Sequence, residues 1–182
     1  LICVVGGEGT HTVAFDKMTG KELWRFGTAT EQGYSPPTII QAAGVRQLIL
    51  ANPNAVNAVN PENGKLQWTT PYEASNGSII MSPVVVGEYL FVGGYSNHNL
   101  LLQLDQQKPG VTVVSRDKTK KFVSPVNVQP FVDGETIYGM DQAGDMVAFK
   151  LPDGDHIWKN TDVIGGRSQG SETAFIVRQG DR

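Results

Sequence analysis

The chain has 182 residues, of which 40% are hydrophobic, and a formal net charge of −3. This length predicts one domain or at most two, with one apolar core, and the acidic balance argues against a nucleic-acid-binding protein, which normally carries a basic face. No apolar stretch approaches the roughly 18 residues that a membrane-spanning helix needs, and the 21 glycines and 10 prolines favour short strands joined by turns over a helical bundle. The single cysteine, Cys3, excludes an internal disulfide and a cysteine-based zinc site.

The sequence opens on an apolar run, residues 1–5, that is typical of a strand already under way. Because no initiator methionine, secretion signal or lipidation motif precedes it, we expect the natural N-terminus to lie outside this sequence. Residues 6–11, GGEGTH, superficially resemble a phosphate-binding loop. They lack the third glycine of that motif and no helix follows, so a hairpin turn is the better interpretation.

Three tryptophans mark an internal repeat. Trp24 and Trp68 are 44 residues apart, Trp158 lies 90 residues further on, and the missing middle copy falls near Val114. Each surrounding segment combines a strand end, a polar turn that closes on a glycine, and an aromatic residue or valine four residues later. The segments are AFDKMTGKELW (14–24), AVNPENGKLQW (58–68), QLDQQKPGVTVV (103–114) and AFKLPDGDHIW (148–158), with turn glycines Gly20, Gly64, Gly110 and Gly154.

A second series of glycines lies between apolar runs at the same spacing, at Gly44, Gly87, Gly134 and Gly180. Each unit of about 45 residues therefore holds four short runs rich in β-branched and aromatic residues, without a helical period. Four antiparallel strands at this period predict an all-β protein, a β-propeller of four-stranded blades, present here as a partial ring of about four blades. The predicted units are residues 1–28, 29–75, 76–121 and 122–165, and residues 166–182 begin a further blade, with a strand over 174–178.

The first segment resembles the repeat of the PQQ-like, or quinoprotein-type, β-propeller family. It matches through Ala14, Asp16, Thr19, Gly20 and Trp24. The second and fourth copies keep the glycine and the tryptophan, whereas the third keeps an aspartate and a glycine but no tryptophan. The aspartate can bond the turn amides and the glycine can adopt positive φ.

The resemblance implies that the indoles pack between neighbouring blades and that a complete ring has about seven or eight blades. We therefore expect an open arc cut from a longer chain, with the missing blades supplied by the rest of that chain. The apolar faces at both ends of such an arc favour association.

No catalytic or metal-binding group of residues stands out. His11, His98 and His156 lack metal-ligand spacing, DQAGD (141–145) is typical of a tight hairpin, and the basic run RDKTKK (116–121) of a solvated loop. The segment GGRSQGSET (165–173) lies where the chain crosses between blades, near the central funnel of a propeller. Its polar residues are the best candidates for a contact with a ligand or partner: Arg167, Gln169 and Glu172, with Glu31, Tyr72 and Glu73 weaker.

Three functions are open. The resemblance favours a non-catalytic scaffold or protein-interaction module without a cofactor, like the BamB-like proteins of bacteria, and it implies a periplasmic or other extracytoplasmic location and a protein partner. The alternative is a fragment of a dehydrogenase that oxidises alcohols or sugars with pyrroloquinoline quinone and Ca²⁺, although no residue here can be matched to that site. A structural or sugar-binding propeller of another family is disfavoured by the tryptophan register.

Overall fold

The computed structural model describes residues 1–29, 31–117, 119–165 and 170–180. Their strands form four antiparallel sheets in chain order, a three-stranded sheet followed by three four-stranded ones. Sheet 1 contains β1 (Ile2–Val4), β2 (Thr12–Phe15) and β3 (Glu22–Phe26), and sheet 2 contains β4 (Thr38–Ala42), β5 (Val45–Ala51), β6 (Ala55–Val59) and β7 (Leu66–Pro71). Sheet 3 contains β8 (Val84–Val86), β9 (Tyr89–Val92), β10 (Asn99–Leu104) and β11 (Val111–Asp117), and sheet 4 contains β12 (Phe131–Asp133), β13 (Thr136–Met140), β14 (Met146–Lys150) and β15 (His156–Asn160). Two short 3₁₀ turns, η1 (Ser75–Gly77) and η2 (Tyr95–Asn97), lie in the connections.

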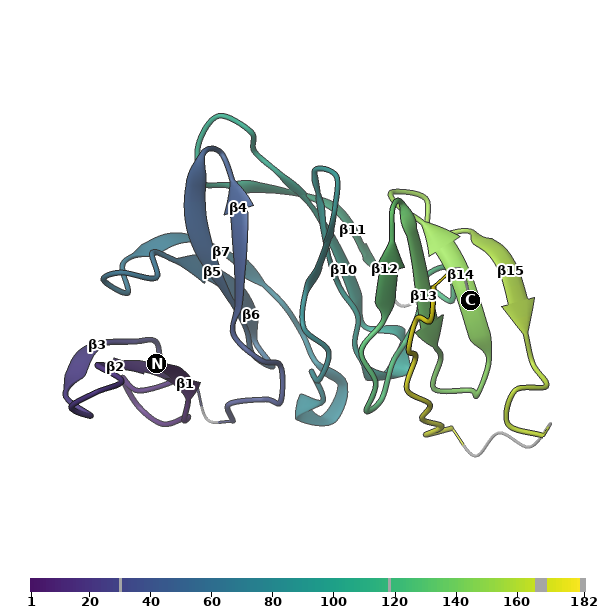
Figure 1. The fold of residues 1–182 in the computed structure, drawn as a ribbon, viewed down its shortest axis with the longest axis horizontal. Helices are drawn as coiled ribbons and strands as arrows, with labels where there is room; N and C mark the ends of the chain where they lie inside the picture. The colour runs from purple at the N-terminus through teal and green to yellow at the C-terminus, as the bar shows by residue number, and fades with distance from the viewer. Residues whose placement is uncertain (30, 118, 166–169, 181–182) are drawn as a thin grey trace.

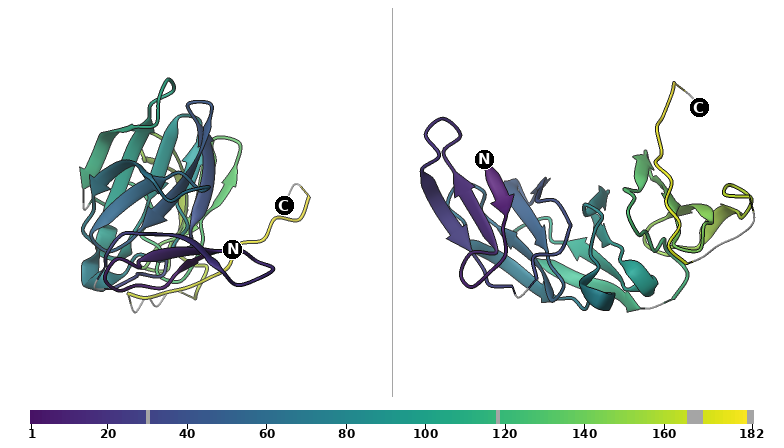
Figure 2. Two further views of the ribbon diagram at one scale, coloured as in Figure 1. Left: turned by 90° about the vertical axis from the view of Figure 1, so that its left-hand side faces the viewer. Right: turned by 90° about the horizontal axis from the view of Figure 1, so that it is seen from below.

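The sheets stand side by side along an open arc, with the N-terminus at one end and the C-terminus at the other (Figures 1 and 2). Neighbouring strands in each sheet are also neighbours in the sequence, so each sheet is an up-and-down blade. The predicted all-β class and the partial propeller are confirmed. Among the described residues, no helix is long and apolar enough to cross a membrane.

The apolar core lies between the sheets rather than inside any one of them. Successive residues of a strand point to opposite faces, so a blade with neighbours on both sides needs a continuous apolar run. In β9, Leu90 and Val92 pack toward sheet 2, whereas Phe91 between them packs toward sheet 4. All three are fully buried. The apolar runs that the sequence shows thus reflect burial on both faces.

The repeat has the same local geometry in each blade at the end of the third strand. The pairing of the third and fourth strands shifts register there in sheets 2 to 4, at Ala58/Val59, Leu101/Leu102 and Ala148/Phe149. In the three-stranded sheet 1 the equivalent pairing of β2 with β3 shifts at Ala14/Phe15. The turn that follows closes at Gly20, Gly64 and Gly154, each with φ near +70°. Gly110 differs from these three glycines, because its φ is not positive. The turn that contains Gly110 has one extra residue, so the chain can reverse direction without a glycine at positive φ.

Two expectations at the ends of the chain have different outcomes. Residues 6–11 form the expected hairpin between β1 and β2, where the Val5 N–H donates to the His11 carbonyl at 2.9 Å. The strand expected over residues 174–178 is wrong, because the structure assigns no strand there. This segment runs beside sheet 4 with no second strand to pair with, and strand geometry is held by such pairing.

Candidate interaction rim

One edge of the arc carries all the connections that pass from sheet to sheet. We call this edge the crossover rim. It consists of residues 27–29 and 31–37, 72–83, 119–130, and 161–165 with 170–173, together with the loop between β1 and β2 and the loops that join the second and third strands of sheets 2 to 4. In the orientation of Figure 1 the crossovers of sheets 2 to 4 run along the lower edge of the arc. Because the central funnel of a propeller opens here, the rim is where a ligand or partner would meet several blades at once.

At the joint between sheets 1 and 2, the rim is tied by His11. The side chain is 1% exposed, its Nε2 lies 3.3 Å from the carbonyl oxygen of Gln32, and its Nδ1 lies 3.0 Å from Thr12 Oγ1. Burial lowers the pKa of His11, partly opposed by the Gln32 carbonyl. These contacts join the His11 ring to the crossover that leads into sheet 2.

At the joint between sheets 2 and 3, Tyr72 and His98 tie the crossover to the loop after β9. The Tyr72 hydroxyl donates to the His98 carbonyl at 2.7 Å, and His98 Nδ1 lies 2.5 Å from the Glu73 carbonyl. Tyr72 is 6% exposed, and its burial raises the pKa of the hydroxyl. It therefore remains a proton donor over the physiological range. Tyr72 thus holds this crossover against the loop of the next sheet.

At the joint between sheets 3 and 4, Ser124 has the same role. It is fully buried, its hydroxyl donates to the Gly94 carbonyl at 2.7 Å, and its N–H donates to Asp141 Oδ2 at 3.0 Å. The Gln142 N–H returns a bond to the Ser124 carbonyl at 2.8 Å. Residues 141–145 form the expected tight hairpin, with Gly144 at φ +85°. A buried polar group thus closes each of the three joints.

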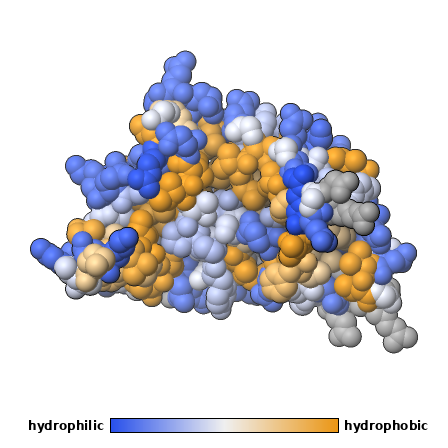
Figure 3. Space-filling view, in the orientation of Figure 1, coloured by the Kyte–Doolittle hydropathy of each residue, from blue (hydrophilic) through white to orange (hydrophobic). Residues whose placement is uncertain are grey.

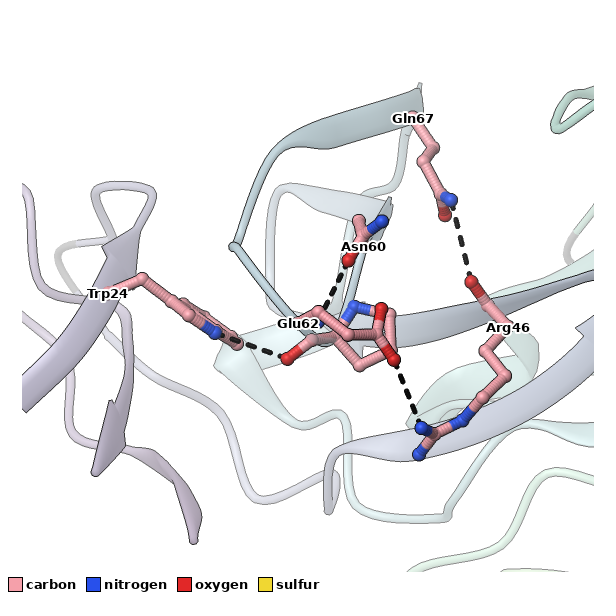
Figure 4. A network of polar contacts seen from close by, with 6 residues as sticks. Trp24, Arg46, Asn60, Glu62 and Gln67 are labelled. Atoms are coloured by element: carbon pink, nitrogen blue, oxygen red, sulfur yellow. Dashed lines mark hydrogen bonds and ion pairs between the residues drawn. The ribbon is translucent and has the colours of Figure 1, made fainter. Parts of the chain in front are cut away.

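Aromatic side chains also pack across the joints between neighbouring sheets. A Cβ added at Gly64 would lie 2.6 Å from Trp24 Cε3, so the indole of sheet 1 covers the turn of sheet 2. Figure 4 shows this contact, in which Trp24 Nε1 donates to the Pro61 carbonyl at 3.1 Å. Beside it, Arg46 pairs with Glu62 at 3.0 Å. Only a residue without a side chain leaves room for the indole here.

The third joint achieves the same contact with a different residue. Val114, the repeat equivalent of the tryptophans, is 44% exposed. Phe122 from the following crossover takes the place of the indole, and a Cβ at Gly154 would lie 2.4 Å from its Cε1. Phe122 also stacks on Phe91 with ring centroids 5.3 Å apart. The tryptophan register did not reveal Phe122, although it is the only aromatic residue between β11 and β12.

The other expected blade-docking residues lie as follows. Trp68 is 8% exposed within the core between sheets 2 and 3, and its Nε1 donates to Gln47 Oε1 at 2.7 Å. Trp158 lies on the end face of sheet 4 and is 42% exposed. Asp16 Oδ1 accepts the N–H of Met18 at 3.0 Å and of Thr19 at 2.8 Å, and these bonds lower the pKa of its carboxyl.

The expected rim contacts are placed only in part. Arg167 and Gln169 lie outside the described residues. Glu172 is half-buried, and its N–H donates to the Gln142 carbonyl at 3.2 Å, across the last described crossover. In the basic run, Arg116 Nη2 donates to Thr70 Oγ1 at 3.1 Å and Lys121 pairs with Asp155 at 3.1 Å. Arg116 lies within β11, not in the loop expected for residues 116–121, and bridges sheets 3 and 2, whereas Lys121 joins the crossover to the β14–β15 turn of sheet 4.

A metal site on this rim would need several converging His, Cys, Asp or Glu side chains. Within residues 1–29, 31–117, 119–165 and 170–180, no group of three or more His, Cys, Asp or Glu side chains is placed to bind a metal. We assign no residue to Ca²⁺ or to pyrroloquinoline quinone.

The comparisons with known proteins agree with this architecture. Residues 1–160 match the family model described as outer membrane protein assembly factor BamB. The chain belongs to the BamB family. Among solved structures, BamB from Moraxella catarrhalis superposes with a TM-score of 0.60 at 21% identity, over 83% of this chain and 46% of that one. The computationally designed Ika8 protein superposes with a TM-score of 0.57 at 8% identity, over 94% of this chain and 48% of that one.

The chain thus spans about half the length of both solved proteins. At these identities, the likeness to each structure shows the fold alone. No curated protein matches the chain in sequence.

Proposed function

We propose that this BamB-family arc is a non-catalytic scaffold whose crossover rim binds a protein partner outside the cytoplasm. Family membership supports the proposal, because the family model is that of an outer-membrane assembly factor. The observation that carries it is the construction of the rim, in which each joint is closed by a buried polar side chain, His11, Tyr72 or Ser124. A rim held in this way presents its exposed groups at fixed positions, and such preorganisation lowers the entropic cost of binding.

The exposed groups on this rim are suited to a protein partner. Tyr34 is 72% exposed in the first crossover. It borders a pocket lined mainly by polar groups, with Glu31 and Gln32 on one side and Asn76 on the other. Aromatic side chains beside polar groups are enriched at protein interfaces, where they supply contact area at low entropic cost. The Tyr34 N–H donates to the Ile79 carbonyl at 2.9 Å, which fixes the backbone beneath the ring.

Site-specific photocrosslinking in the periplasm of a Gram-negative host tests this function. A photoreactive phenylalanine analogue replaces Tyr34 on the rim or, as the matched control, Met18, which is 83% exposed in the β2–β3 turn on the opposite edge. We expect one protein adduct of defined mass from position 34 and none from position 18. Equal adducts at both positions, or none at position 34, would contradict a rim-specific partner.

The catalytic alternative has a direct assay. The chain is mixed with pyrroloquinoline quinone and Ca²⁺, and dye-linked oxidation of an alcohol or an aldose is followed. We expect no turnover above the rate without protein. Turnover that depends on both additives would replace the scaffold with a quinoprotein dehydrogenase.

A further inference from the structure

Charged side chains are distributed unevenly along the crossover rim. One part of the rim lies over sheets 1 to 3, and we call it the acidic part. It consists of the crossovers on either side of sheet 2 and of three loops, that is, residues 5–11, 27–29, 31–37, 52–54, 72–83 and 93–98. These residues include three glutamates, Glu8, Glu31 and Glu73, but no aspartate, lysine or arginine. The crossover after sheet 3 has the opposite character, because it carries Lys120 and Lys121.

The three glutamates of the acidic part have no cationic partner among the residues that the structure describes. All three are exposed, and none takes part in an ion pair there. Glutamates on the opposite edge of the arc differ, since Glu62 pairs with Arg46 at 3.0 Å and Glu135 with Lys150 at 3.2 Å. Unpaired like charges on one surface create a negative potential, which attracts a positively charged partner.

Glu31 also lines a pocket between the two crossovers that flank sheet 2. The pocket has a volume of about 240 Å³, and its walls are residues 31–34 of the first crossover and Asn76 and Gly77 of the second. A Cβ built on Gly77 would overlap Glu31 Oε2, so the carboxylate reaches from one crossover onto the other. Each crossover joins two sheets of the arc, so neither wall is an end of the sequence. Figure 3 shows pale to blue surface in the middle of the lower edge, where the crossovers run.

The backbone on both sides of the pocket is held by close contacts. A Cβ built on Gly33 would lie 2.8 Å from Cγ2 of Ile79, a residue that is 0% exposed. The Tyr34 N–H donates to the Ile79 carbonyl at 2.9 Å, and the Ser78 N–H donates to the Ser75 carbonyl at 2.9 Å. Both walls are therefore in place before a partner arrives, which lowers the entropic cost of binding.

The groups around this pocket suit a guanidinium group. The Glu31 carboxylate can accept two parallel hydrogen bonds from it, and the Tyr34 ring, which is 72% exposed, offers a face on which a planar cation can stack. Gln32 and Asn76 add amide oxygens that can accept further N–H groups. A lysine ammonium is a point charge and cannot make the two-fold contact. The pocket is smaller than the roughly 300–1,000 Å³ of sites for drug-sized ligands, so it suits one side chain.

We propose that this pocket holds an arginine side chain of the protein partner, with the guanidinium against the Glu31 carboxylate and the Tyr34 ring. Glu8 and Glu73 attract further basic residues of the same partner surface. This inference rests on the proposed function, because it names the chemistry of the partner that binds the crossover rim.

Labelled homopeptides of arginine, lysine and citrulline test the chemistry of the pocket directly. Fluorescence anisotropy with the purified chain measures their affinities. We expect the arginine peptide to bind about fivefold more tightly than the lysine peptide, as a stacked and doubly bonded guanidinium should. The citrulline peptide, which keeps the shape and lacks the charge, should not bind. Equal affinities for arginine and lysine, or no binding of either, would overturn the arginine pocket.

The substitution Glu31→Gln separates the pocket from the general charge of the rim. It should remove the preference for arginine over lysine, because the amide cannot accept both N–H groups of the guanidinium fork. The matched control Glu73→Gln makes the same change of charge outside the pocket. It should weaken both peptides equally and leave the preference intact. A preference that survives Glu31→Gln would contradict the assignment, and an unchanged unfolding midpoint in urea would show that this variant still folds.

Photocrosslinking from position 34 distinguishes failure of this inference from failure of the proposed function. The phenylalanine analogue keeps an aromatic ring there, and adding Glu31→Gln should lower the adduct yield about fivefold, whereas adding Glu73→Gln should lower it by less. An adduct that is insensitive to Glu31→Gln would leave the partner in place and refute the arginine contact. Loss of the adduct in every version would refute the partner, while the peptide affinities still decide the chemistry of the pocket.

Discussion

Phe122 shows how a repeat can lose its marker residue and keep the contact. In the third unit the turn of the next sheet still needs an aromatic cover, because Gly154 leaves a flat recess there. The ring arrives from the crossover instead of from the fourth strand, and it contacts both Phe91 and Phe149, with centroids 5.3 and 6.0 Å away. Since Phe122 is 2% exposed, its removal leaves a cavity that the surrounding rings cannot fill.

The substitution Phe122→Ala should therefore destabilise the chain by about 3–5 kcal/mol in urea unfolding. Val114→Ala is the matched control at the repeat position of the tryptophans. Because Val114 is 44% exposed, that change should cost less than about 1 kcal/mol. Equal losses for the two variants would show that Phe122 contributes no more to this joint than Val114 does.

Trp68 gives a second test of an aromatic residue at a joint. Trp68→Ala should cost about 3–5 kcal/mol, because it removes a buried indole and leaves Gln47, which is 0% exposed, without its donor. Trp68→Phe keeps an apolar ring and should cost less. The unfolding midpoints of both variants in urea separate the contribution of the buried ring from that of the hydrogen bond to Gln47. An unchanged midpoint for Trp68→Ala would exclude the docking role.

The buried His11 makes stability depend on pH in a defined direction. Its pKa is lowered in the folded chain, so between that lowered pKa and the ordinary value near 6.5 the unfolded chain binds more protons. Stability contributed by neutral His11 is therefore present above about pH 6.5 and is lost as the pH falls below it. His11→Gln should show a smaller loss of unfolding free energy than the unmodified chain between pH 7 and pH 5. Parallel curves for the two proteins would contradict this assignment.

At the scale of the single element, some glycine turns leave the space that an aromatic ring of the neighbouring sheet occupies. Gly64 and Gly134 both have positive φ, +69° and +58°, but a Cβ at Gly134 would meet nothing within 4 Å, whereas one at Gly64 would meet the Trp24 ring. Gly134→Ala should therefore cost only the backbone strain of about 1–2 kcal/mol. Gly64→Ala should cost a further 1–3 kcal/mol or so, because the indole must move. Chemical denaturation of both variants measures the difference in unfolding free energy. Equal costs would show that the Trp24 ring does not depend on the absence of a side chain at Gly64.

The elements that sequence reasoning could predict are those in which the residue types alone determine the geometry. Continuous apolar runs separated by glycine turns predicted the strands of each blade, because a sheet that is buried on both faces needs apolar residues at successive positions. Gly110 and residues 174–178 were not predictable in the same way. The extra residue at Gly110 changes how the turn reverses, and an apolar run such as residues 174–178 becomes a strand only beside another strand.

The interaction rim was the least predictable part of the chain. Tyr72 and Ser124 carry no local motif, since their hydroxyls bond to carbonyls of His98 and Gly94, 26 and 30 residues away in the sequence. Such partners are set by the packing of one blade on the next. The crossover positions could be inferred from the repeat, but the side chains that hold them together could not.

At the scale of the whole molecule, the chain is a row of sheets in which each contacts mainly its neighbours, so protection should be greatest at the centre and least at the ends. β10 in sheet 3 pairs with β9 and β11 and is covered on both faces, whereas β1 pairs with β2 alone. In hydrogen exchange, amides of β10 should therefore be the slowest and those of β1 among the fastest. Protection of β1 equal to that of β10 would contradict this gradient along the row of sheets.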